Sequence, residues 1–129
     1  MGVILQPNNT IDDVMINWWN WRPTVNLLLQ AGAISSGEAE CLSIALGTIE
    51  VSGQQAIRMA DAVDAALLLL VNPGDRLLLN GQVTVAPPVY PVFRPGSDAH
   101  DMWDWYGAQR SWLETFSTFC RLSGGFTPL

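Results

Sequence analysis

The spacing of hydrophobic positions predicts about four helices. Residues 53–71 give the clearest pattern, with apolar side chains recurring every three or four residues on one helical face: Ala56, Ala60, Val63, Leu67 and Leu70. The last two turns of this segment are apolar on nearly all sides, so we expect them to be the most deeply buried. Shorter apolar stripes predict helices over 23–30 and 36–46. A final helix is expected from about Ser97, or from just after Gly107, with an inner face of Trp105, Gln109, Trp112, Phe116, Phe119 and Cys120.

Residues with known preferences for helix ends support these boundaries. Pro23 suits the first position of a helix, because a backbone N–H at that position would make no hydrogen bond within the helix. Ser35 with Glu38, and Ser52 with Gln55, have the spacing of capping boxes. Three glycine positions mark expected helix ends: Gly32, Gly47 and Gly124.

Between the helices, residues 76–85 predict a β-hairpin with a two-residue turn at Asn80 and Gly81. Residues 1–16 predict an extended or irregular lead-in, and the proline-rich stretch 86–98 a long extended connection. The sequence therefore predicts one domain, 1–129, of the α+β class. It is expected to be mainly α, with about four helices in one layer-like bundle beside the small antiparallel hairpin.

The amino-acid composition is unusually poor in charged residues. Hydrophobic residues make up 49% of the 129 residues and charged residues only 14%, which favours a partner or self-association covering part of the surface. The net charge is −6, and all six basic residues are arginines. These arginines are scattered singly, so the chain would repel nucleic acids and anionic membranes, whereas a basic protein partner suits its charge.

The cysteines and the apolar runs indicate a reduced, cytoplasmic protein. Cys41 and Cys120 both lie in apolar helical patterns, typical of buried thiols, although a single disulfide is an alternative. Two cysteines and one histidine are too few for a structural zinc site. The N-terminus lacks a signal-peptide pattern, and the longest apolar run, 65–71, is too short to cross a bilayer.

Catalytic, metal and cofactor patterns are weak. His100 and Asp104 lie one helical turn apart, so the aspartate could orient the histidine as a general base for catalysis. Together with Asp98 and Asp101, they could also bind a divalent ion. Acidic residues in a helix's first turn are expected in any case, because they complement the helix dipole. We therefore predict no catalytic residue, no metal and no cofactor.

Tryptophan is the residue type that most needs an explanation. Trp18, Trp19 and Trp21 precede the first predicted helix, and Trp103, Trp105 and Trp112 belong to the last, so the rings could form one aromatic cluster. If residues 18–21 are extended, alternation places Trp19 and Trp21 in the core and Trp18 toward a partner. Arg22 could stack on a ring or cap the last helix. The candidate binding residues are Trp18, Trp19, Trp21, Arg22, His100 and Trp103.

Three segments resemble one family of proteins. Trp19-Asn20-Trp21-Arg22-Pro23, the helix SGQQAIRMADAVDAAL and the ending FSTFCRLSGGF resemble small uncharacterised bacterial proteins with a Trp-x-Trp-Arg-Pro start and a Phe-rich C-terminal helix. That family often has Cys directly before Gly-Gly, where this chain has Ser123. The resemblance implies a single bacterial, cytoplasmic domain and no known activity.

These observations favour a non-enzymatic protein-binding module. Its sharpest form is a bacterial immunity protein that neutralises a basic toxin, because the chain is small, acidic and rich in aromatic residues. The alternative is a small-molecule-binding protein or minor enzyme with a pocket lined by tryptophans, Arg22 and His100. A structural subunit or homodimer is a third possibility.

Overall fold

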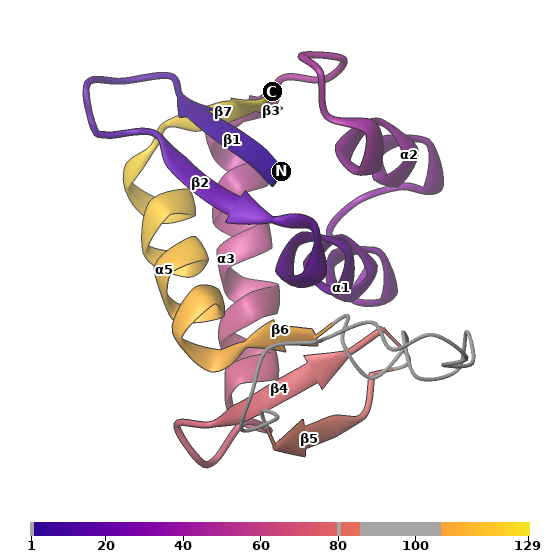
Figure 1. The fold of residues 1–129 in the computed structure, drawn as a ribbon. Helices are drawn as coiled ribbons and strands as arrows, with labels where there is room; N and C mark the ends of the chain where they lie inside the picture. Colours follow the sequence, from indigo (N-terminus) through magenta and orange to yellow (C-terminus); the bar gives the residue numbers. More distant parts are fainter. Residues whose placement is uncertain (1, 80, 86–106) are drawn as a thin grey trace, which may run out of the picture.

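Two antiparallel sheets lie at opposite ends of a pair of helices (Figure 1). The computed structural model describes residues 2–79, 81–85 and 107–129. Its helix pair is α3 (Gly53–Leu67) and α5 (Arg110–Leu122), which pack along each other between the sheets. The described residues thus form an α+β fold, as predicted. The expected single bundle layer with one hairpin is wrong, because the strands make two separate sheets.

The four-stranded sheet brings both ends of the chain together. Its order is β2-β1-β7-β3, all antiparallel, with these strands: β1 (Gly2–Pro7), β2 (Val14–Asn17), β3 (Val51–Ser52) and β7 (Gly125–Pro128). Residues 1–16 were predicted to be extended or irregular, and most of them are extended, in β1 and β2, although no strand pairing was predicted for them. Val3 and Leu5 alternate into the core, but Ile4 between them is also apolar, so the strand pattern is obscured in the sequence.

The three-stranded sheet contains the predicted hairpin. Its order is β5-β4-β6, with these strands: β4 (Asp75–Leu78), β5 (Val83–Val85) and β6 (Gly107–Gln109). The predicted two-residue turn at Asn80 and Gly81 is wrong, because the N–H of Leu78 bonds to the carbonyl of Gln82, whereas such a turn would pair Leu79 with Gln82. Gly81 takes the left-handed conformation (φ 83°) that favours glycine, and Asn80 lies outside the described residues.

Helix α1 (Trp18–Gln30) begins earlier than predicted. The Asn17 side chain accepts a hydrogen bond from the Asn20 N–H at 3.0 Å and caps the helix at Trp18, so Pro23 lies inside the helix and not at its first position. The predicted end is confirmed. Gly32 has φ 75°, and the Ala33 N–H returns to the carbonyl of Leu28 at 2.9 Å, as in a Schellman motif.

Helix α2 (Ser36–Ile44) has the predicted capping box and ends sooner than expected. The Ser35 hydroxyl accepts from the Glu38 N–H at 3.2 Å, and the Glu38 carboxylate accepts from the Ser35 N–H at 2.9 Å. Ala45 and Leu46 follow with φ of 59° and 53°. These positive values stop the helix before the predicted Gly47, and they are costly for residues that carry a Cβ.

The second predicted capping box, at the start of α3, forms only in part. The Ser52 hydroxyl accepts from the Gln55 N–H at 3.1 Å, as predicted. The Gln55 side chain does not return to Ser52, but donates to the Glu38 carboxylate at 2.6 Å. The hydrogen bond from the Ser35 N–H, followed by that from Gln55, lowers the pKa of Glu38. The Gln55 bond also ties the start of α3 to the start of α2.

Helix α5 starts after β6, at the second of the two positions that the sequence allowed. Its predicted inner face is buried at Trp112, Phe116, Phe119 and Cys120, whereas Gln109 belongs to β6 and is exposed. A Cβ at Gly107 would lie 2.9 Å from the Arg76 Nη1 and 3.2 Å from the Arg76 Cβ, so any side chain there would require the buried Arg76 to shift. Trp105, Ser97 and the connection 86–98 lie outside the described residues.

An aromatic core joins the sheets to the helices. The Trp21 ring meets Phe116 edge to face at 5.8 Å, and Phe116 contacts Trp112 and Phe126 at 5.4 and 6.1 Å. Trp21 is fully buried, and its Nε1–H donates to the carbonyl of Leu42 at 2.9 Å, which satisfies its one polar group. The prediction that Trp21 packs against the last helix is thereby confirmed.

Candidate functional site

The predicted aromatic site is divided by helix α1. Because residues 18–22 are helical, Trp18 and Arg22 lie one turn apart, and the Arg22 Cζ lies 5.8 Å from the centroid of the Trp18 ring. The predicted stacking of Arg22 on a tryptophan is therefore confirmed. Trp21 points into the core, so it does not share a surface with this pair.

The strand-like alternation assumed for the tryptophans is wrong for the same reason. Trp18 and Trp19 are both half-buried, so neither is the fully exposed residue that alternation suggested for Trp18. His100 and Trp103 lie outside the described residues, and their membership of a binding site stays a prediction. Within the described ranges, no three His, Cys, Asp or Glu side chains gather as a metal site would need.

A polar cluster joins α3 to α5. Arg121 donates to Asp61 at 2.9 Å and to Asp64 at 2.6 Å, and the Ser117 hydroxyl donates to Asp64 at 2.5 Å. Ser117 is buried at this contact. The hydrogen bonds from Ser117 and Arg121 lower the pKa of Asp64, so the carboxylate stays ionised and serves to join the helices.

The cysteines are free, as expected from the sequence. Cys120 is buried in the aromatic core, and burial raises the pKa of its thiol well above the ordinary value. A thiol held protonated in this way is a poor nucleophile. Cys41 is half-buried on α2.

The end of α3 exposes a run of aliphatic side chains. Leu68, Leu69 and Val71 are 81%, 61% and 75% exposed, whereas Leu70 between them is fully buried. The expectation that this end is the most deeply buried part of the helix is therefore wrong. The helix ends at Leu67 in a tightened turn, which turns only Leu70 inward. We call Leu68, Leu69 and Val71 the α3-terminal patch.

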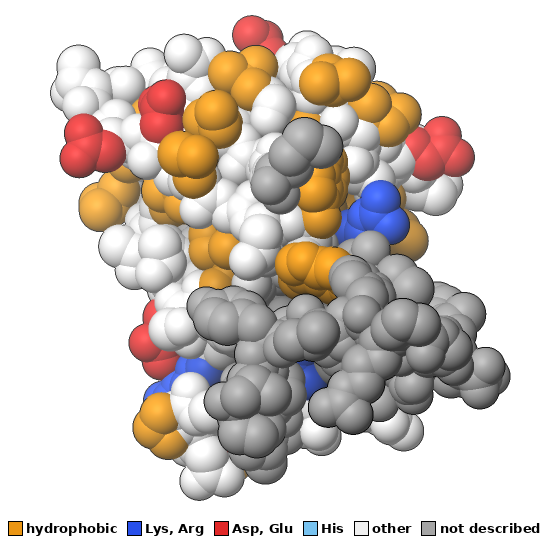
Figure 2. All heavy atoms as spheres, in the orientation of Figure 1, with side chains coloured by type: hydrophobic (Ala, Val, Ile, Leu, Met, Phe, Trp, Pro, Cys, Tyr) orange, Lys and Arg blue, Asp and Glu red, His pale blue; other side chains and the backbone are white. Residues whose placement is uncertain are grey.

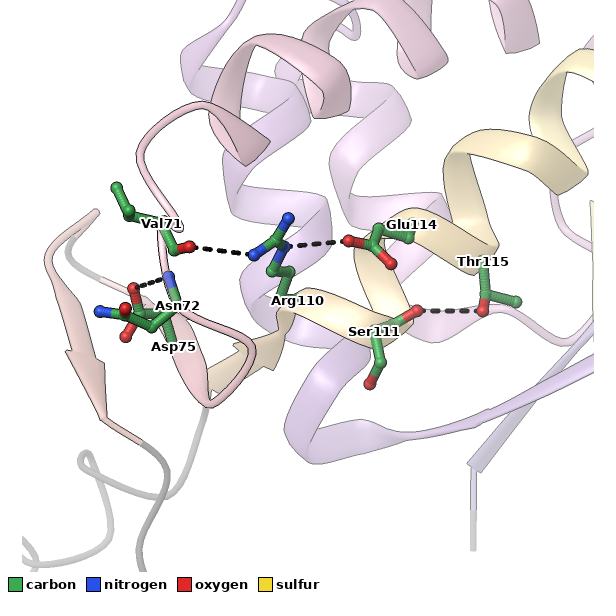
Figure 3. Close-up of polar contacts among 7 residues, drawn as sticks. All are labelled: Val71, Asn72, Asp75, Arg110, Ser111, Glu114 and Thr115. Carbon is green, nitrogen blue, oxygen red and sulfur yellow. Dashed lines mark hydrogen bonds and ion pairs between the residues drawn. The ribbon is translucent and has the colours of Figure 1, made fainter.

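Arg110 connects this patch to the first turn of α5 (Figure 3). Its Nη1 donates to the carbonyl of Val71 at 3.1 Å, and its Nε donates to the Glu114 carboxylate at 2.9 Å. The guanidinium thus lies between the two groups and fixes the last residue of the patch to α5. The turn after Val71 is closed by the Asp75 carboxylate, which accepts from the Asn72 N–H at 3.0 Å.

An open groove of about 560 Å³ runs along the outer side of α5. One wall comes from the β1–β2 loop and β2, at Ile11, Asp12 and Val14. The other wall is α5 between Ser111 and Leu122, where hydroxyl groups follow one another at helical spacing: Ser111, Thr115 and Thr118. We call it the α5 groove. Glu114 also lines it, so the Arg110–Glu114 pair joins the groove to the α3-terminal patch.

The surface around these features is apolar with a negative margin. Asp12, which lines the groove, and the neighbouring Asp13 are both exposed, whereas Glu114 is paired with Arg110. On the face shown in Figure 2, hydrophobic side chains gather over β1, β2 and α2, with acidic side chains at the margins. Among the described helices, none has the length and apolar character needed to cross a membrane.

The chain matches no protein-family model, no curated protein and no solved structure. The resemblance to small bacterial proteins with a Trp-x-Trp-Arg-Pro start therefore stays a prediction. The α5 groove and the α3-terminal patch were not predicted, because their residues are far apart in the sequence or were expected to be buried.

Proposed function

We propose that this protein is a non-enzymatic protein-binding module whose partner is basic. The observation that carries the proposal is the α3-terminal patch, three large aliphatic side chains exposed after the end of α3 and linked to the α5 groove through Arg110 and Glu114. Exposed apolar groups cost solubility, and a contiguous patch is typical of an interaction surface. A partner that covers Leu68 and Leu69 would gain roughly 2 kcal/mol from each fully buried side chain.

The fixed position of the patch also supports binding. Arg110 ties its last residue to α5, and Leu70 anchors the segment in the core, so little conformational freedom is lost when a partner docks. The net charge of −6 would speed encounter with a basic partner and discourage an acidic one.

In the described part of the chain, the polar side chains that could act in catalysis are already engaged in contacts that stabilise the fold. Asp64 and Ser117 bond to each other, Arg121 holds two carboxylates, and the Cys120 thiol is buried and protonated. This arrangement favours binding over chemistry. The finer form of the proposal is an immunity protein for a basic toxin, which is supported by the chain's small size and acidic charge.

The proposal can be tested by site-specific photocrosslinking in the native cell. A benzophenone amino acid is placed at Leu69 in the patch or, as a control, at Gln54, an exposed polar residue at the other end of the same helix. We expect one discrete adduct from position 69, containing a basic protein, and none from position 54. Equal labelling from both positions, or no adduct from either, would contradict the proposal.

A second pair of variants separates binding from folding. Leu68→Ser with Leu69→Ser should remove the adduct formed from a probe at Val71 and leave the urea midpoint close to that of the parent, because both leucines are exposed. A lost adduct together with a large fall in stability would mean that these leucines support the fold, which would count against the proposal.

A further inference from the structure

β2 is an edge strand, and the sheet register shows which of its backbone groups point outward. On β1, the N–H and C=O of Ile4 bond to Leu129 at 3.1 and 2.7 Å, on the side of β7. Neighbouring residues of a strand bond to opposite sides, so Val3 faces β2 and pairs with Ile16. Met15, the next residue of β2, therefore directs its N–H and C=O away from β1, to an edge where no strand pairs in the described ranges.

This edge lacks the devices that usually prevent further strand pairing. Proteins commonly place lysine, proline, inward charge or a bulge on an exposed edge. β2 reads Val-Met-Ile-Asn, contains no charge or proline, and pairs with β1 in unbroken register. Met15 is 76% exposed. The opposite edge of the same sheet, β3, has only two residues and runs straight into α3, so it offers little to a partner.

The α5 groove lies beside the free edge of β2. Val14, the first residue of β2, lines the groove together with Ile11 and Asp12 of the preceding loop, so the groove meets β2 where this edge strand begins. A strand added to β2 would lie about 4.8 Å from it and would reach the groove beside Val14. The hydroxyl groups of Thr115 and Thr118 and the apolar side chains of Phe119 and Leu122 would then face the added strand.

The negative charge beside the β2 edge favours the addition of a basic strand. Asp12 and Asp13 directly precede β2, and Glu114 lines the groove opposite. A second copy of this chain would bring a further net charge of −6 to the same edge, so self-pairing is disfavoured. A basic segment with alternate apolar side chains would satisfy the edge hydrogen bonds, fill the apolar part of the groove and neutralise the carboxylates.

We propose that β2 binds an extended, basic segment of a partner protein by strand addition, with that segment lying in the α5 groove. The inference rests on the proposed protein-binding function and names the mode of binding and the chemistry of the partner. Met15 supplies backbone hydrogen bonds to the added strand, and the exposed Asp12 and Asp13 supply the preference for basic side chains.

Three short synthetic peptides provide the test. The first alternates valine and lysine, the second alternates valine and glutamate, and the third is the first peptide with alternate backbone nitrogens methylated. Binding is measured by fluorescence anisotropy at low and high salt, and amide hydrogen exchange locates the site. We expect the Val–Lys peptide alone to bind, to protect the Met15 N–H from exchange, and to weaken as salt is raised.

Two substitutions at Met15 form a matched pair. Met15→Pro should keep the fold, because that N–H takes no part in the β1–β2 ladder. It should weaken binding about tenfold or more, since a lost N–H and a ring at the edge remove at least one hydrogen bond to the peptide. Met15→Ala retains the N–H and should bind far more tightly than Met15→Pro.

Several results would overturn the inference. They are no binding of the Val–Lys peptide, equal binding of the Val–Glu or methylated peptide, unchanged binding to Met15→Pro, or a dimer in sedimentation that protects β2. None of these affects the crosslink expected at Leu69. Failure of strand addition is therefore distinguishable from failure of the protein-binding function.

Discussion

Leu68 and Leu70 are two positions apart and chemically identical, yet the structure predicts very different costs for their removal. Leu70 is fully buried, so Leu70→Ala loses the burial of three carbon groups and leaves a cavity, for an expected loss of about 3 kcal/mol. Leu68 is 81% exposed. Only about a fifth of the same transfer energy applies there, so Leu68→Ala should cost about 0.5 kcal/mol or less.

Urea denaturation followed by tryptophan fluorescence measures both changes, because the buried Trp21 and Trp112 report on the core. The two variants should unfold with the parent's dependence on urea, so that the shift in midpoint gives the free energy directly. Equal costs for Leu68→Ala and Leu70→Ala would refute the reasoning. Equally large costs would mean that Leu68 is also buried and that the α3-terminal patch does not exist, and equally small costs would mean that Leu70 is not buried.

Three further predictions concern the core, the helix pair and the strained loop. Thr24→Val should lower the free energy of unfolding by about 2 kcal/mol in urea denaturation, because the Trp112 Nε1–H loses its 2.8 Å acceptor inside the core. In a Trp112→Phe background the same change should cost clearly less, and additive costs would contradict the contact. Asp64→Asn should flatten the acid side of the stability profile, since a lowered pKa gives stability that is present above the unfolded value of about 3.9 and is lost as pH falls through the folded pKa. An unchanged slope between neutral and acidic pH would contradict this role. Leu46→Gly should leave the protein as stable or raise its melting temperature, because φ is 53° and the side chain is exposed, and a clear fall would show that the loop is not strained.

Local signals in the sequence predicted the parts of the fold that depend on a few neighbouring residues. The Ser35–Glu38 capping box and the Gly32 helix end each form within one helical turn, and the structure confirms both. The inner face of α3 follows in the same way from its spacing. The stacking of Arg22 on Trp18 is local too, because residues four apart meet on any helix.

The strand pairs and the surface groove were predicted less well, because the residues that form them are far apart in the sequence. β1 pairs with β7 across almost the whole chain, and β6 pairs with β4 across the proline-rich connection, so neither strand has a local signal for its partner. The α5 groove joins residues near 12 to residues near 115. Of the candidate binding residues, the sequence predicted stacking of Arg22 on a ring as one of two roles, and the helix that brings Trp18 to it was not predicted.

The sequence by itself determined the helix caps, the apolar face of α3, the hairpin and the negative charge, since these follow from residues in contact along the chain or from composition alone. The tertiary structure decided which of four successive apolar residues, 68–71, is buried, and which edge of the four-stranded sheet is free. Burial depends on which distant segments arrive to cover a side chain. A run of leucines has the same local pattern whether it lies in the core or faces a partner.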